Sequence, residues 1–527
     1  MNAPGMPCIQ GVTRLLEHTK QAFQVSPKLR SQLRKRKRRL VARRSRCTPA
    51  SGPLLTRRRA RLEVADRIVA TSAGGLAAAH QVACLAGLPD EIDRTVRVLR
   101  QHQPYHESDH VLAVAYNLLA GGTTIAELDR LRSDEALLDA LGVDKLPAPS
   151  TAGDFCRRFE AADLDALAKA INTARLRVWR RAALAQREKT AIIDVDGTIV
   201  GTTGECKEGM ALTHKRIWGY GPLIVSLANT AEPLFVVNRP GNTGAADQAP
   251  KYLDESIALV REAGFEDVLL RGDSAFSMTK FLDAWHDRGV RFVFAYQAAP
   301  NLKTKADELP DDEYETLVRQ AKRALKRLPK TRYKQAFVEA KGYHDIHLDG
   351  EDIAEFEYSP RACKRAYRMI VLRKDLSHTK GTGGQREMWK DVRYFFYITN
   401  DKALSAEQVV FHSNRRCNQE NLIAQLKSSR CLYAPVDTLL GNAAYMMIAS
   451  LAWTLKAWMA LSLPVSPRWR ARHEEERRRW LTMEFRSFIS TVIGLPAQVL
   501  ESGRRIVVRF LSWSDQLHIL CRMQATL

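Results

Sequence analysis

The sequence predicts an α/β protein in which a helical region precedes a β-sheet, and three patterns support this prediction. Apolar runs separated by tight turns occur between residues 191 and 242 and are typical of strands. Residues 256–297 then alternate between helical and strand patterns. Residues 62–190 instead place apolar side chains at helical spacing. A run of strands followed by strand–helix–strand–helix–strand indicates one sheet with a meandering half.

The size and charge of the chain limit the classes of protein to consider. Its 527 residues exceed one ordinary domain, so two or three domains are expected. Hydrophobic residues make up 45% of the chain, so most of it should be folded. The formal net charge of +22 favours a polyanionic partner, either nucleic acid or an anionic membrane surface. A solvated basic surface is the simpler alternative, but so large a charge makes nucleic acid the expected partner.

The nine cysteines are odd in number, scattered along the chain, and form no CxxC motif. Neither a zinc ribbon nor a disulfide framework is predicted, and a reducing compartment fits best. The first thirty residues contain no apolar run typical of a secretory signal. We therefore expect a cytoplasmic protein.

The N-terminal residues 1–61 include the most biased stretch of the chain. Residues 28–61 hold fifteen Lys or Arg and no acid. Such a block repels itself, so we expect a flexible arm that binds phosphates. An organelle transit peptide and a disordered solubilising tail are the alternatives. The candidate phosphate contacts in its densest cluster are Arg34, Lys35, Arg36, Lys37, Arg38 and Arg39.

Residues 62–190 are expected to form a helical region for DNA binding or dimerisation. Residues 107–122 carry an apolar stripe that ends at a glycine pair, and residues 123–142 repeat this pattern. Thr124 and Glu127 have the spacing of a capping box. The region should therefore contain several short, well-delimited helices.

Three histidines in this region, His102, His106 and His110, are spaced by four residues and raise the question of a metal site. Pro104 interrupts any helix that would align them. A metal site at these histidines is therefore not favoured.

The first core segment, residues 191–297, should contain strands joined in part by helices. The expected helices are 256–264 and 280–289. The expected strands are 191–200, 222–230, 233–242, 267–276 and 290–297.

Residues 298–400 lose this rhythm and are expected to form a β-rich insertion with a loop at 378–387. The core should resume as helices over residues 401–465, before a C-terminal region at 466–527. The expected strands of the insertion are 333–349, 355–359, 367–373 and 392–400.

Residues 439–463 are long and apolar enough to mimic a membrane span. Asn442, Lys456 and several small residues interrupt the run, within a chain that otherwise has a soluble composition. We expect a core helix and no membrane contact, with a membrane span as the alternative.

Two acids, Asp194 and Asp196, lie inside the apolar run AIIDVDGTIV. Side chains at i and i+2 of a strand share a face, so both point the same way. A third acid, Asp273, ends the apolar strand VLLRGD. Carboxylates that converge from two strands form a hard-oxygen site for Mg²⁺ or Mn²⁺, whereas either acid alone could be a turn or cap residue. We predict that Asp196, beside the Gly-Thr turn, is the ligand, and that Asp194 supports the site or the fold.

Residues 411–429 have the pattern of a helix that carries Arg416, Glu420 and Lys427 on one side. A glutamate flanked by cations suits a metal-dependent phosphodiester site. The glutamate would complete the metal ligands, and the arginine and lysine would hold phosphate oxygens. A solvated stripe of charges is the alternative.

The letters DVDGT also match the first motif of haloacid-dehalogenase phosphatases, where the first Asp is the nucleophile and the second a general acid. That reading would reverse the roles of Asp194 and Asp196. It leaves the basic N-terminal cluster and the helix of Glu420 without a purpose, so it remains an alternative.

Taken together, several segments resemble one family, the DDE transposases of bacterial insertion sequences. The resemblance is to the family numbered thirteen-eighty, within the group that shares a Y-R-E-K signature, and it covers roughly residues 65–515. The segments that carry it are AGGTTIAELDRLRSDEALLDALG, PSTAGDFCRRF, IIDVDGTIV, YGPLIVSLANT, NRPGN, LLRGDSAFS and RCNQENLIAQLK.

The resemblance implies an RNase H-like core with a β-strand insertion between the second Asp and the Glu. It also implies a catalytic triad of Asp196, Asp273 and Glu420 that binds two divalent metals, Mg²⁺ or Mn²⁺. Arg416 and Lys427 match the Arg and Lys of the signature. The signature Tyr falls on Ser413, so no Tyr role is carried over.

The implied function is cut-and-paste transposition by a bacterial, nucleoid-associated enzyme. The protein would bind the terminal inverted repeats of its element, cut there, and join the freed 3′-ends to target DNA. Its partners would be double-stranded DNA and a second copy of the chain, because two ends must be held together. A decayed or domesticated DNA-binding protein is the rival, and the departure at Ser413 is what suggests it.

Overall fold

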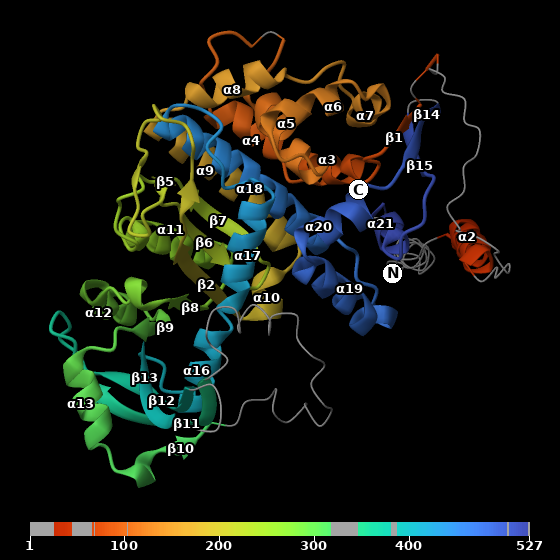
Figure 1. The fold of residues 1–527 in the computed structure, drawn as a ribbon. Helices are drawn as coiled ribbons and strands as arrows, with labels where there is room; N and C mark the ends of the chain where they lie inside the picture. The colour runs from red at the N-terminus through yellow and green to blue at the C-terminus, as the bar shows by residue number, and fades with distance from the viewer. Residues whose placement is uncertain are drawn as a thin grey trace, which may run out of the picture.

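A mixed nine-stranded sheet forms the centre of the protein, in the order β10-β11-β12-β13-β9-β8-β2-β6-β7 (Figure 1). The computed structural model describes residues 26–44, 66–67, 69–102, 104–317, 346–380, 387–502 and 505–524. The mixed α/β class expected from the sequence is therefore confirmed.

The core half of the sheet contains both parallel and antiparallel pairs. Strand β2 (Thr190–Gly197) pairs in parallel with β8 (Asp267–Gly272), which pairs in parallel with β9 (Arg291–Tyr296). On its other edge β2 pairs antiparallel with β6 (Leu223–Leu227), which is followed by β7 (Glu232–Val237). The connecting helices are α11 (Ala249–Glu262) and α12 (Thr279–Asp287), as the alternating pattern predicts. The chain segment that connects β2 to β6 forms a small separate sheet. Its strands, in spatial order, are β3 (Val200–Gly201), β5 (Trp218–Tyr220) and β4 (Ala211–Leu212).

The strands that the sequence assigns to an insertion extend this same sheet. Strand β13 (Glu387–Thr399) pairs antiparallel with β9 and β12 (Tyr367–Lys380), so the hydrogen bonding continues without a break. The strands are longer than predicted and run into the expected loop 378–387. Residues 318–345 and 381–386, which include most of the predicted strand 333–349, lie outside the described residues. The remaining elements here are α13 (Pro300–Glu308), η3 (Asp311–Glu313), β10 (Glu315–Thr316) and β11 (Ile346–Tyr358).

The predicted helical region packs around one long helix, α18 (Leu439–Leu461), which contacts α3, α5, α8, α9 and β7. The capping box is confirmed, since the Thr124 backbone N–H donates to Glu127 at 2.8 Å. The elements of this region are α3 (Leu76–Leu85), α4 (Leu88–Thr95), α5 (Glu107–Leu119), η1 (Ile125–Glu127), α6 (Leu128–Arg132), α7 (Glu135–Leu141), α8 (Pro149–Arg157), α9 (Ala161–Arg181) and α10 (Leu184–Glu188).

Helix α18 is the helix of the described chain that is long and apolar enough to cross a membrane by length and composition. In the fold, 94% of its most apolar window is buried inside the protein, as expected for a core helix. Buried Lys456 within it donates from Nζ to the Leu481 carbonyl at 2.8 Å, and burial lowers the pKa of Lys456 to about 7. The polar interruptions in this apolar run therefore meet protein partners.

A buried carboxylate ties the helices to the sheet. Glu232 of β7 has no exposed surface. It accepts hydrogen bonds from Arg175 and Trp179 of α9 at 3.2 and 2.9 Å, and from Trp458 of α18 at 3.1 Å. Because the charge is both paired and hydrogen-bonded, its burial is tolerated.

The C-terminal region joins the N-terminal part through a three-stranded sheet, in which β1 (Ala70–Thr71) pairs with β14 (Ala497–Ser502) and β14 with β15 (Arg505–Phe510). The other elements of this region are η4 (Pro467–Trp469), α19 (Arg470–Thr482), α20 (Phe485–Phe488), the π-helical turn η5 (Ile489–Ile493) and α21 (Leu517–Met523).

The expectation of a flexible arm needs correction for its described part, because residues Pro27–Arg44 form helix α2. Leu33 on one side of α2 packs against the hydrophobic core. Arg36, half-buried on the same side, donates to the carbonyls of Phe510 and Ser512 at 2.8 and 3.0 Å. Contacts with the distant C-terminal segment thus support a helix where charge repulsion alone predicts a flexible chain.

Candidate active site

The first two acids of the predicted site lie at the ends of neighbouring parallel strands. Val195 of β2 is opposite Gly272 of β8, so the residues that follow, Asp196 and Asp273, come side by side where the strands end. Asp273 accepts a hydrogen bond from the Ala275 backbone N–H at 2.9 Å and thereby caps the short helix η2 (Ser274–Phe276). The parallel register therefore brings together two carboxylates that are 77 residues apart.

The predicted single helix over residues 411–429 is wrong, because the structure divides it. Helix α16 (Ala406–Asn414) ends before Arg415, and α17 (Cys417–Ser428) begins after Arg416. Cys417 begins the helix that packs on β2, while α16 packs on β9 and β11–β13. The two helices face different parts of the sheet, and a straight helix could not cover both.

A buried glutamine fixes α17 on the sheet. Gln419 is 1% exposed and donates from Nε2 to the Ile224 carbonyl at 3.2 Å, while its Oε1 accepts from the Ser226 hydroxyl. Both partners lie on β6, next to β2. Sequence reasoning missed Gln419, although an amide on the buried side of an amphipathic helix was a signal for it.

The neighbouring residue, Glu420, faces the strand ends. Its side chain is 61% exposed, and the guanidinium of Arg416 lies between it and Asp196. Arg416 NH1 is 3.9 Å from Asp196 Oδ2, and NH2 is 3.9 Å from Glu420 Oε1. The NH1 atom is buried and has no hydrogen-bond partner among the described residues.

The electrostatic environment of Asp196 shows that the three acids act on one another. Burial is the main cause that raises the pKa of Asp196 to about 6. The charge of Arg416 opposes this rise, and the charges of Asp273 and Glu420 add to it. Carboxylates that repel one another in a partly buried position form an oxygen-rich site that a divalent cation would relieve. These three residues therefore fit a hard metal ion.

Asp194 lies two residues before Asp196 on β2, farther from the strand end, and forms an ion pair with a different residue. Arg271, opposite it on β8, donates from Nε and NH2 to its two carboxylate oxygens, both at 2.7 Å. Both side chains are almost completely buried, and Arg271 also donates to the His412 carbonyl at 3.2 Å. Both carboxylate oxygens of Asp194 are therefore occupied by Arg271. The sequence analysis did not identify Arg271, because its partner lies on another strand.

Lys427, at the end of α17, points to the turn that follows β2. Its Nζ donates to the Ile199 carbonyl at 2.8 Å and to the Thr198 hydroxyl at 3.4 Å. Partial burial, together with the nearby charge of Lys215, lowers the pKa of Lys427. The ammonium group thus lies at the rim of the site beside the Gly-Thr turn.

The position of the signature Tyr carries no aromatic ring in this chain. Ser413 is buried in the last turn of α16. Phe411 packs against a hydrophobic cluster that includes Leu269 and Val293 of the sheet. His412 contributes its backbone carbonyl to Arg271. None of the three places a ring hydroxyl near the acids.

The predicted phosphate contacts of residues 34–39 lie elsewhere, on α2 beside α21 and β15 and away from β2 and β8 (Figure 1). Arg36 is used for docking, as described above. The other five predicted contacts, which are exposed on this helix, are Arg34, Lys35, Lys37, Arg38 and Arg39.

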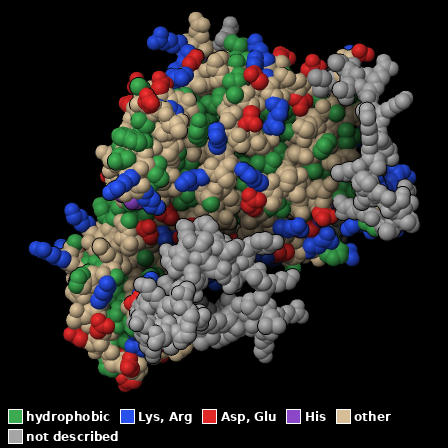
Figure 2. Space-filling model, in the orientation of Figure 1, with side chains coloured by type: hydrophobic (Ala, Val, Ile, Leu, Met, Phe, Trp, Pro, Cys, Tyr) green, Lys and Arg blue, Asp and Glu red, His purple; other side chains and the backbone are tan. Residues whose placement is uncertain are grey.

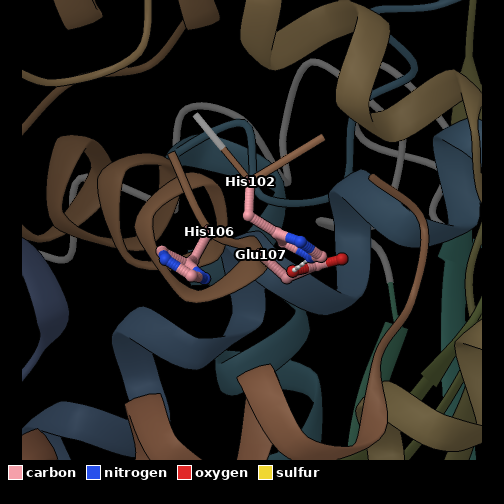
Figure 3. Close-up of side chains that lie close together, drawn as sticks. All are labelled: His102, His106 and Glu107. Carbon is pink, nitrogen blue, oxygen red and sulfur yellow. Dashed lines mark ion pairs between the residues drawn. The ribbon is translucent and has the colours of Figure 1, made fainter. Parts of the chain in front are cut away.

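Of the three histidines spaced by four residues, two lie close together in the structure, and the third lies elsewhere. His102, His106 and Glu107 lie together, with one ligand atom from each within 4.8 Å of the others (Figure 3). His102 Nε2 is 3.2 Å from Glu107 Oε2, which forms an ion pair when the histidine is protonated. His110 is not part of the group and stacks on Phe155 with ring centroids 4.5 Å apart. Glu107 also accepts a hydrogen bond from the Leu99 backbone N–H at 3.2 Å, so its carboxylate connects α5 to the segment before it.

Comparison with known proteins gives the chain its family. No curated protein matches it at a significant level. Among solved structures, the piggyBac transposase in a synaptic complex with hairpin DNA is similar at 10% sequence identity and a TM-score of 0.33, covering 80% of this chain and 85% of that one. The family model described as transposase DDE domain group 1 matches residues 57–527, which is most of the chain. The protein therefore belongs to the DDE transposase family.

Proposed function

We propose that this protein is an active cut-and-paste transposase of a bacterial insertion sequence, in the family numbered thirteen-eighty with the Y-R-E-K signature, and that it has an RNase H-like core. The observation that carries the proposal is geometric. Asp196 and Asp273 follow paired residues at the ends of neighbouring parallel strands, and Arg416 lies 3.9 Å from both Asp196 and Glu420. Three carboxylates that meet in this way have a clear use in metal-dependent phosphoryl transfer.

The three carboxylates would hold two Mg²⁺ or Mn²⁺ ions. When bound, the ions supply Lewis-acid activation of the attacking oxygen and stabilisation of the leaving oxygen. Asp196 is partly buried and accepts a hydrogen bond from the Gly197 N–H at 2.8 Å, which would orient its carboxylate toward the ions. Asp194 holds Arg271 and stays outside the ligand set.

The cations around the site have separate tasks. Arg416 has a buried donor with no hydrogen bond among the described residues, and we assign it to a phosphate oxygen of the cleaved strand. Lys427, anchored on the turn after β2, would fix the DNA backbone beside the scissile phosphate. Neither residue needs to exchange a proton in this role.

The reaction has two steps of the same kind. A water oxygen attacks the phosphorus at the element end, and the bond to the 3′-oxygen breaks to leave a 3′-hydroxyl. This hydroxyl then attacks a phosphodiester of target DNA, which releases another 3′-oxygen. One site serves both steps because each is an in-line displacement that depends on positioning and charge.

The proposal also includes the assembly of the enzyme and the place where it acts. Two element ends must be held together, so we propose a homodimer on double-stranded DNA. The enzyme would act in the bacterial cytoplasm, on the nucleoid, and without membrane contact.

Two other functions can be compared with this one. A decayed DNA-binding protein would have no need to keep three mutually repelling carboxylates, although Ser413 does depart from the signature. The phosphatase reading needs Asp194 as a free nucleophile, but both of its oxygens accept hydrogen bonds from Arg271. The family of the chain also speaks against a phosphatase.

The test is end cleavage of a plasmid that carries the gene with its flanking DNA, in the presence of Mn²⁺. We expect Asp196→Asn, Asp273→Asn and Glu420→Gln each to lower cleavage at least about 1,000-fold, because each removes a metal ligand. Glu135→Gln changes an exposed acid of α7 and should leave cleavage unchanged. Full cleavage by all three site variants would contradict the proposal, and binding without any Mn²⁺-dependent nicking by the unaltered protein would favour the decayed copy.

A further inference from the structure

A basic groove lies between the N-terminal helix and the C-terminal region, far along the chain from the three acids. It has a volume of about 800 Å³, and Arg30, Arg34 and Lys37 of α2 form one of its sides. Arg472 and Arg479 of α19 form part of the other side. On the face drawn in Figure 2, Lys and Arg side chains gather over α19 and at α2. Segments more than 400 residues apart in sequence thus build one cationic surface.

The charge of the groove is not neutralised from within. Among the described residues that line it, Asp515 is the one acid. Neither Arg468 nor Arg479 has an ion pair with a described residue, and both are exposed. Within the described part of the chain, the other carboxylate paired with the lining is Glu476, which binds Arg472, Arg522 and His518 at once, and these contacts lower its pKa to about 2. Asp515 and Glu476 therefore leave a large excess of positive charge along the groove.

An arginine in the lining of the groove has donors without partners. Arg522 is 5% exposed and lines the groove, and its NH1 donates to Glu476 at 2.6 Å. Its Nε and NH2 have no hydrogen-bond partner in the described structure. Buried donors of a charged group are normally paired, so these two point to an anion that is supplied from outside.

Aromatic rings accompany the cations. Trp469 is 45% exposed and carries the guanidinium of Arg468, 5.4 Å from its ring centroid, while Trp513 also lines the groove. Exposed large aromatic side chains among arginines are typical of surfaces that bind nucleic acid backbones and sugars. An acidic protein partner would not require this mixture.

The groove is linked to the candidate active site through α17. The Phe485 backbone N–H donates to Gln425 at 2.9 Å, and Arg486 donates to the Ser428 carbonyl at 3.0 Å. Gln425 and Ser428 lie on the last turns of the helix that carries Glu420. These contacts join the helix of Glu420 to α20, which follows α19 in the chain.

We propose that the groove between α2 and α19 binds the sugar-phosphate backbone of a DNA duplex outside the cleavage site, with Arg522, Arg468 and Arg479 as phosphate contacts. The inference rests on the proposed function, since duplex DNA is the substrate in question. It adds a second binding surface in which the C-terminal region takes part as much as the basic N-terminal cluster. Phosphates spaced along a duplex suit an elongated surface of separate cations.

The experiment measures binding of a fluorescent duplex of about 30 base pairs in EDTA at several salt concentrations. The double variant Arg468→Glu/Arg479→Glu should bind at least about 10-fold more weakly, and the slope of log affinity against log salt should fall by about 2. The matched control, Arg100→Glu/Arg181→Glu, changes the charge by the same amount at two exposed residues that lie outside α2 and do not line the groove. Thermal melting of both variants establishes that they fold.

Four outcomes bear on the proposal. Equal loss of affinity in both double variants, or none in either, would overturn it. Loss of binding to phosphatidylserine vesicles with unchanged DNA binding would also overturn it. Asp196→Asn should bind the duplex normally in EDTA. If the unaltered protein never cuts DNA, but the groove variant still binds the duplex more weakly than the control variant, the proposed function is refuted and the proposal for the groove stands. If the protein cuts DNA, but the two double variants bind the duplex equally well, only the proposal for the groove is refuted.

Discussion

At the scale of single residues, the fold treats two aspartates on one strand face in opposite ways. Asp194 is neutralised by Arg271 through two hydrogen bonds of 2.7 Å. Asp196, two residues later, has no such partner and faces Asp273 and Glu420, with Arg416 only at 3.9 Å. The strand end thus changes from a satisfied ion pair to a set of repelling charges, which costs stability.

Replacement of the two aspartates should therefore change stability in opposite directions. The folded metal-free protein binds a proton at Asp196 more tightly than the unfolded chain, because the pKa is raised from 3.8 to about 6. Stability is lost as the pH rises through this window, and the penalty is fully present above it. Asp196→Asn removes the penalty and should stabilise the metal-free protein at pH 7 by about 1–3 kcal/mol.

Asp194→Asn should instead destabilise the protein by about 3–5 kcal/mol, because it leaves Arg271 buried without its counter-charge. Denaturant unfolding in EDTA at pH 7 and near pH 4 measures both variants. The gain from Asp196→Asn should vanish at the lower pH, where the wild-type carboxyl is protonated. A stabilising Asp194→Asn or a destabilising Asp196→Asn at pH 7 would contradict this account.

At the scale of secondary-structure elements, the decisive feature is the attachment of α17 to the sheet. The third carboxylate is on a helix, so its distance from Asp196 depends on how that helix is held. Gln419 provides the hold through Ile224 and Ser226, and the break at Arg415–Arg416 lets α17 take its own direction. Glu420 is therefore positioned by its sequence neighbour rather than by its own contacts.

Gln419→Ala should weaken this attachment and leave a buried carbonyl and hydroxyl without partners, at a cost of about 1–3 kcal/mol. We expect the Mn²⁺ concentration needed for half-maximal cleavage to rise several-fold and to be partly compensated by excess Mn²⁺, while DNA affinity in EDTA is unchanged. Asn421→Ala, on the exposed side of the same helix, is the control. An unchanged metal requirement in Gln419→Ala would show that α17 is held by other contacts.

At the scale of the whole molecule, the N-terminal helices, α18 and the sheet share one continuous hydrophobic core. The N-terminal and C-terminal regions are also in direct contact, because β1 pairs with β14 and the loop before α3 lies against η5. Gly75 donates to the Ile493 carbonyl at 3.0 Å, and a Cβ there would lie 2.1 Å from the Val492 carbonyl oxygen. The N-terminal and C-terminal regions should therefore unfold together.

Gly75→Ala tests this coupling, because the added methyl group must displace backbone of the C-terminal region. We expect a loss of about 2–4 kcal/mol in one cooperative transition. Gly244→Ala is the matched control, since a Cβ at Gly244 meets nothing within 4 Å. Two separate transitions in Gly75→Ala, or equal stability of the two variants, would show that the regions are independent.

The position of Asp196 at a strand end, and the face that it shares with Asp194, could be predicted because their signals are local. Apolar runs define β2 and β8, and the period of two places Asp194 and Asp196 on one face. The turn that follows Asp196 marks it as the acid at the strand end. Other features depend on contacts that no local pattern contains, such as the Asp194–Arg271 pair and the anchor at Gln419.

The sequence by itself determined the α/β class, the order of core strands and helices, the excess of positive charge, and the face that carries the acids. Each follows from neighbours along the chain, through side-chain periodicity, turn chemistry or composition. Only the tertiary structure decided which acid is paired, that the insertion strands continue the central sheet, and that the basic N-terminal segment is a helix docked on the C-terminal region. The physical reason is that strand register and helix docking are set by partners many residues away, whose energies add only when the chain has folded.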